Sequence, residues 1–129
     1  MQTETTKTTE STELENALVY FTGTEAYHKF SAFSQLKLTD GVKYLCEKAG
    51  SYWLMDIIHS YQNKCKQDEM LKDFQMWTLT VNSDNTATVI CERDTDDIVI
   101  TQDIPYTDFP LKNIKLYCIN EIIMLTSEY

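Results

Sequence analysis

The sequence has few glycines and prolines and no long apolar run. Three Gly and two Pro in 129 residues exclude a collagen-like, linker-rich or low-complexity chain. No apolar run approaches the roughly 18 residues of a membrane span. The start MQTETTKTTESTE has neither the basic nor the apolar region of a signal peptide. We therefore expect a cytoplasmic protein that makes no membrane contact.

Clustered metal ligands are also missing. The four cysteines, at positions 46, 65, 91 and 118, form no CxxC pair, and the two histidines, His28 and His59, lie far apart. This spacing favours neither a disulfide framework nor a zinc site. A chain of this length buries a sizeable core without such support, so we expect one domain with reduced thiols, no metal and no cofactor. Cys65, between Lys64 and Lys66, is the thiol that we expect to be most exposed and reactive.

Basic residues are scarce. Eleven Lys and Arg against 20 Asp and Glu give a net charge of -9, which disfavours direct nucleic-acid binding. Four acids gather in one predicted turn, namely Glu92, Asp94, Asp96 and Asp97. The turn lacks the central Gly and terminal Glu of a calcium loop. It is either a solvated hairpin tip or part of an acidic face that imitates nucleic acid and inhibits a host or defence protein.

Helical periodicity is confined to the first half of the chain. Residues 1–11 are almost entirely polar and are predicted to form a disordered acidic, Thr-rich tail. A capping box, apolar stripes at i, i+3, i+4 and i+7, and capping positions at Asp40 and Ser51 then predict three helices. These cover about 12–21, the stretch from Asp40 to Gly50, and the stretch from Ser51 to Tyr61.

Alternation of apolar and polar residues dominates the second half. It predicts strands at 77–81, 86–91, 98–101, 114–118 and 122–125. Short polar turns join the first three strands into a meander. We predict a single α+β domain over residues 12–129, with about three N-terminal helices packed on a four- or five-stranded antiparallel meander sheet.

One pair of residues has the types needed for acid-base chemistry. Asp56 and His59 are three positions apart on a predicted helix, so His59 could serve as a general base oriented by Asp56 in a small hydrolase or transferase. The alternative is a surface pair with no chemical role. No nucleophile elbow of the GxSxG type accompanies the two residues, so a non-enzymatic protein is favoured.

Aromatic residues are dense between positions 20 and 33. Tyr27, Phe30 and Phe33 belong to this segment. Aromatic side chains at this density either complete the core or anchor a protein interface. The favoured function is therefore a protein-binding module, acting as a monomer or homodimer on a partner of unknown identity. Its candidate contacts are these aromatics and the acidic turn.

The segments TDGVKYLCEKAGSYWLMDIIHSYQ, FQMWTLTVN, ITQDIPYTDFPL and LTSEY occur in this order along the chain. With them the sequence resembles an uncharacterised bacterial domain family of unknown function, from Glu15 to Tyr129. The resemblance implies a small stand-alone protein of plasmid or phage settings, with an accessory role and a cytoplasmic location. It implies no catalytic residue.

Overall fold

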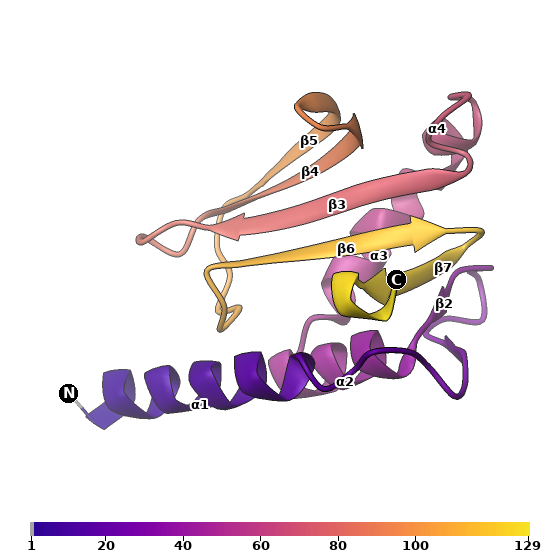
Figure 1. Ribbon diagram of the computed structural model, residues 1–129. Coiled ribbons are helices and arrows are strands. Elements are labelled where there is room, and N and C mark those ends of the chain that lie inside the picture. The colour runs from indigo at the N-terminus through magenta and orange to yellow at the C-terminus, as the bar shows by residue number, and fades with distance from the viewer. Residues whose placement is uncertain (1) are drawn as a thin grey trace.

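The computed structural model describes residues 2–129, with side chains described from residue 10 onward. Four α-helices and a short 3-10 helix lie in this part of the chain (Figure 1). They are α1 (Gln2–Leu18), α2 (Asp40–Ala49), α3 (Tyr52–Ser60), α4 (Gln62–Lys66) and η1 (Thr126–Glu128).

A single mixed sheet runs through the domain, in the order β1-β2-β7-β6-β3-β4-β5. Its strands are β1 (His28–Lys29), β2 (Lys37–Leu38), β3 (Phe74–Val81), β4 (Ala87–Asp94), β5 (Asp97–Ile104), β6 (Asn113–Ile119) and β7 (Ile122–Leu125). Strands β2 and β7 pair in parallel, and the other neighbours are antiparallel.

The α+β class is correct, but the predicted four- or five-stranded antiparallel meander is wrong. The sheet has seven strands and one parallel pair. Strands β1 and β2 have two residues each, which is too short for alternation to be visible in the sequence. Strand β6 pairs with β3, so the meander β3-β4-β5 forms only one side of the sheet.

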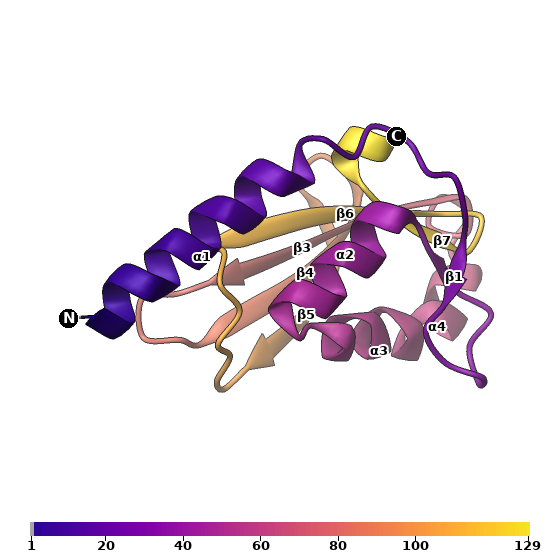
Figure 2. The ribbon, with the colours of Figure 1, turned by 90° about the horizontal axis from the view of Figure 1, so that it is seen from below.

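The core lies between the helices and one face of the sheet. Figures 1 and 2 show α2 and α3 against that side, with α1 beside α2. Alternate residues of the central strands point toward the helices and are buried, among them Trp77, Leu79, Val89, Cys91 and Leu116. This alternation is the period-2 pattern that predicted the strands.

Helix α2 confirms the predicted apolar stripe, although its first capping residue is different. Thr39, not Asp40, is the N-cap, and its side chain accepts a hydrogen bond from the Val42 backbone. Gly50 ends the helix with φ 61°, a left-handed conformation that glycine adopts without a steric penalty.

The C-terminal residues close against the start of α2. A Cβ atom added to Gly41 would lie 2.6 Å from Leu125 Cδ1 and 2.7 Å from Glu128 Oε1. Glu128 accepts hydrogen bonds from the Thr39 hydroxyl at 2.6 Å and from the Gly41 backbone at 3.2 Å. The close approach therefore depends on glycine at position 41.

Helix α1 ends at Leu18, earlier than the predicted helix at 12–21, and Thr12 lies inside it. Leu14 and Leu18, one turn apart, are its buried residues. The backbone of residues 2–11 belongs to α1, and the side chains of residues 1–9 lie outside the described part. Disorder of residues 1–11 stays a prediction.

Candidate functional site

A groove of about 720 Å³ lies beside the edge strand β1. Its walls come from the β1–β2 segment and from the turn between β6 and β7. The lining residues are Tyr27, Lys29, Ala32, Phe33, Ser34, Gln35, Lys37, Asn120, Glu121 and Ile122. The groove therefore contains two of the predicted binding residues, Tyr27 and Phe33.

The aromatic side chains of this groove point to solvent. Phe33 is 93% exposed and Tyr27 is 56% exposed. The Phe33 backbone donates a hydrogen bond to the Ser31 hydroxyl at 3.1 Å, and the Leu36 backbone donates one to Ser34 at 3.1 Å. These local bonds form a tight turn that leaves the Phe33 ring outside the core.

Phe30, the third predicted aromatic, has a different position. It is half-buried and packs against the core. Its ring meets the His59 ring edge to face, with 6.5 Å between the centroids. The position of Phe30 therefore fits a residue that completes the core better than one that anchors a protein interface.

Two lysines stand directly opposite each other in the groove. Lys29 of β1 and Lys37 of β2 are Cα partners in the antiparallel pair. Neither forms an ion pair with any residue that the structure describes. Glu121, the acid that lines the groove, is paired with Lys66 at 3.6 Å. The groove is therefore locally basic in a chain whose net charge is -9.

The structure does not bring Asp56 and His59 together as a hydrogen-bonded pair. Both are exposed, and within the described residues His59 is hydrogen-bonded to Ser34, whose hydroxyl lies 2.9 Å from His59 Nδ1. Ser60 donates its hydroxyl to the Ile57 carbonyl instead. Ser34 is 25 positions from His59, so no sequence spacing pointed to this pair. A catalytic role for Asp56 and His59 stays a prediction.

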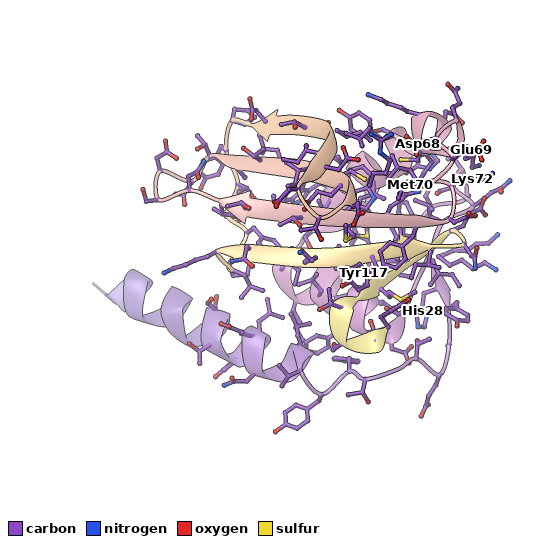
Figure 3. All side chains as sticks on the ribbon, turned by 45° about the horizontal axis from the view of Figure 1, so that its top comes forward. His28, Asp68, Glu69, Met70, Lys72 and Tyr117 are labelled. Carbon is purple, nitrogen blue, oxygen red and sulfur yellow. The ribbon has the colours of Figure 1, made fainter. Side chains whose placement is uncertain are left out.

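The acidic turn lies at the tip of the β4–β5 hairpin, next to the sheet edge opposite the groove. Arg93 pairs with Asp97 at 2.8 Å and with Asp68 at 2.8 Å. Asp68 lies in the turn after α4 (Figure 3). The hydrogen bond from Arg93 lowers the pKa of Asp97. Glu92 accepts a hydrogen bond from the Asp96 backbone.

Asp94 and Asp96 are the two acids of this turn that remain exposed. Asp94 accepts a hydrogen bond from the next backbone N–H, that of Thr95. Arg93 therefore reduces the net charge of the turn, and the local bonds hold its shape. No group of three or more His, Cys, Asp or Glu residues in the described part is arranged to hold a metal ion.

Cys65 is fully buried, so the prediction that it is exposed was wrong. Its position on α4 points the thiol into the core rather than toward the flanking lysines. A hydrogen bond from Cys91 lowers the pKa of Cys65, and the same bond together with burial raises that of Cys91. Burial raises the pKa of Cys46 and of Cys118 to about 12. The reactivity of Cys65 stays a prediction.

Asp40 connects the groove strand β1 to helix α2. His28 (Figure 3) lies 2.7 Å from one carboxylate oxygen of Asp40, and the Glu25 backbone donates to the other at 2.9 Å. The hydrogen bond from His28 is the main cause that lowers the pKa of Asp40, followed by that from Glu25. The ionised carboxylate therefore fixes the segment that leads into the groove.

This arrangement predicts a pH dependence of stability. A lowered pKa in the folded state stabilises the fold above the ordinary pKa of Asp, and this contribution is lost as the pH falls through the lowered value. We expect Asp40→Asn to be less stable than the wild type at pH 7, and the difference to shrink as the pH is lowered to about 2. Urea unfolding at both pH values measures this difference. A difference that does not change with pH would contradict the assignment.

Comparisons with known proteins give a family but no activity. No curated protein and no solved structure matches the chain. Among the described residues, no helix is both long enough and apolar enough to cross a membrane. The profile of a family of unknown function, DUF6876, matches residues 12–129. The match covers most of the chain, and the protein therefore belongs to this family of unknown function.

Proposed function

We propose that the protein is a non-enzymatic protein-binding module and that its contact surface is the groove beside β1. The observation that carries the proposal is the pair of exposed aromatic rings, Phe33 and Tyr27, on a groove of about 720 Å³. Single exposed apolar side chains are ordinary on protein surfaces. Aromatic rings that share one groove are typical of the residues that dominate binding energy in interfaces.

The turn around Phe33 supports the same proposal. Leu36, three residues later, is buried, so the segment contacts the core at Leu36 rather than at Phe33. The hydrogen bonds from the Phe33 and Leu36 backbones hold the turn in which Phe33 faces solvent. A backbone that is already fixed in this way loses little conformational entropy when a partner covers the turn.

The proposal also includes the biological setting of the protein. The sequence resemblance supports an accessory protein of the bacterial cytoplasm in a plasmid or phage setting. The acidic turn is the alternative contact surface, in which the module would act as a nucleic-acid mimic that inhibits a host or defence protein. The ion pairs of Arg93 with Asp97 and Asp68 weigh against it, because they neutralise part of the charge.

The proposal predicts that Phe33→Ala loses binding without losing stability. Phe33 is 93% exposed, so its removal is expected to change the free energy of unfolding by less than about 0.5 kcal/mol. An interface anchor of this kind is worth about 2 kcal/mol or more, which corresponds to a loss of affinity of about 30-fold. Urea unfolding of the wild type and the variant tests the first value. Affinity purification from host cells, followed by binding measurements on the recovered protein, tests the second.

Tyr106→Ala is the matched control, because Tyr106 is 67% exposed and does not line the groove. We expect this variant to retain every partner of the wild type. Equal recovery of all partners by the wild type and Phe33→Ala would contradict the proposal. A partner lost only from the triple variant Asp94→Asn, Asp96→Asn, Asp97→Asn would support the acidic turn as the contact surface instead.

A further inference from the structure

The two lysines of the groove form an arrangement that costs stability in the free protein. Lys29 and Lys37 are directly opposite across β1 and β2. Like charges at such positions are destabilising. Among the described residues, three other lysines pair with an acid, namely Lys43 with Glu47, Lys66 with Glu121 and Lys72 with Glu69.

Acids are scarce at the groove, although the sequence has 20 acids and 11 basic residues. Glu121 is the acid that lines the groove, and Lys66 already pairs with it at 3.6 Å. Asp40, close in sequence, is occupied by His28 and the Glu25 backbone. Among the described residues, none supplies a carboxylate to Lys29 or Lys37.

We propose that the groove binds an acidic peptide segment of a partner protein, in which carboxylates face Lys29 and Lys37 and an apolar side chain contacts Phe33 and Tyr27. This inference rests on the proposed function and adds the chemistry of the partner. The complementarity is local, because the rest of the chain is strongly acidic. A long polyanion such as a nucleic acid would meet this acidic surface on either side of the groove.

Edge strand β1 fits such a ligand. It is the outermost strand of the sheet, and β2 occupies only one of its sides. An extended peptide beside β1 would place alternate side chains toward the groove. Carboxylates on that face would replace the repulsion between the two lysines with two ion pairs. The bound state would then remove a cost that the free protein carries.

The variant Lys37→Glu separates a binding role from a structural one. In the free protein it converts the repulsion into a cross-strand ion pair, and we expect the Tm to rise by about 2 °C. In the complex it places a negative charge opposite a carboxylate of the peptide, and the affinity for an acidic peptide should fall more than tenfold. A variant with a lower Tm and unchanged affinity would overturn the inference.

The direct test selects ligands from a random peptide library displayed on phage, with the purified full chain as bait. We expect the recovered peptides to be enriched in Asp and Glu next to an apolar residue. A fluorescent copy of the most enriched peptide should bind about tenfold more weakly to the double variant Lys29→Gln, Lys37→Gln, and more weakly at 300 mM than at 50 mM salt. The control Lys112→Gln, Lys115→Gln carries the same net charge outside the groove.

The outcomes separate the two proposals. Peptides that depend on Phe33 but show no acidic enrichment would overturn this inference and leave the binding groove in place. If no selected peptide binds the wild type better than it binds the Phe33→Ala variant, both proposals are overturned. Binding of a 20-nucleotide single-stranded DNA that depends on Lys29 and Lys37, with no peptide binding, would overturn the acidic-peptide inference in favour of nucleic acid.

Discussion

Replacing Gln75 by alanine is expected to lower the free energy of unfolding by about 3 kcal/mol, because several buried hydrogen-bonding groups lose their partner at once. Gln75 and Gln62 exchange two amide hydrogen bonds, each 2.9 Å long. The Trp77 indole N–H also donates to Gln75, at 2.8 Å. Gln75 is 4% exposed and Gln62 is 7% exposed, so the groups that lose their partner are shielded from bulk water.

A double-mutant cycle distinguishes this network from simple loss of volume. The variant Gln62→Leu, Gln75→Leu removes both amides together and keeps the volume. Its loss in the free energy of unfolding should be clearly smaller than the sum of the losses caused by Gln62→Leu alone and Gln75→Leu alone. Urea unfolding followed by tryptophan fluorescence supplies the four values. Strict additivity would show that the two amides act independently and would contradict the predicted coupling.

Glu128→Ala is expected to lower the free energy of unfolding by about 2 kcal/mol, through the loss of charge-assisted hydrogen bonds. The carboxylate accepts from the Thr39 hydroxyl, the Gly41 backbone and the Leu125 backbone. These bonds tie the last residues of the chain to the first turn of α2. A negative charge at a helix N-terminus also interacts favourably with the helix dipole.

Two variants control this measurement. Glu128→Gln keeps the shape and one acceptor oxygen but not the charge, so we expect about half of the loss. Glu13→Ala removes an exposed charge from α1 and should change the free energy of unfolding by less than about 0.5 kcal/mol. Thermal and urea unfolding should show the largest loss of stability for Glu128→Ala, a smaller loss for Glu128→Gln and the smallest for Glu13→Ala. An equal effect of Glu128→Ala and Glu13→Ala would contradict the capping role.

Local patterns in the sequence predicted the elements that local forces stabilise. The stripe before Gly50 became α2, and the alternation around Trp77 became the centre of β3. The predicted N-cap was wrong by one residue, because Thr39 and Asp40 both have capping side chains. The tertiary contacts of Asp40 with His28 and the Glu25 backbone decided which residue caps α2.

The candidate site could be predicted only in part. Of the three aromatic residues that the sequence predicted as binding residues, Tyr27 and Phe33 are exposed, whereas Phe30 packs against His59 and the core. The flanking lysines predicted an exposed Cys65, whereas the orientation of α4 buries this thiol. The sequence shows which residue types are present, but not toward which side of a short helix or turn each one points.

The sequence by itself determined the α+β class, the helices α2 and α3 and the strands of the second half, because periodicity within one segment reports which face is buried. Tertiary structure alone decided the parallel pairing of β2 with β7, the bond between Ser34 and His59, and the capping of α2 by Glu128. It also placed Lys29 opposite Lys37. These contacts join short or distant segments, and such segments carry no repeating pattern that could reveal their partner.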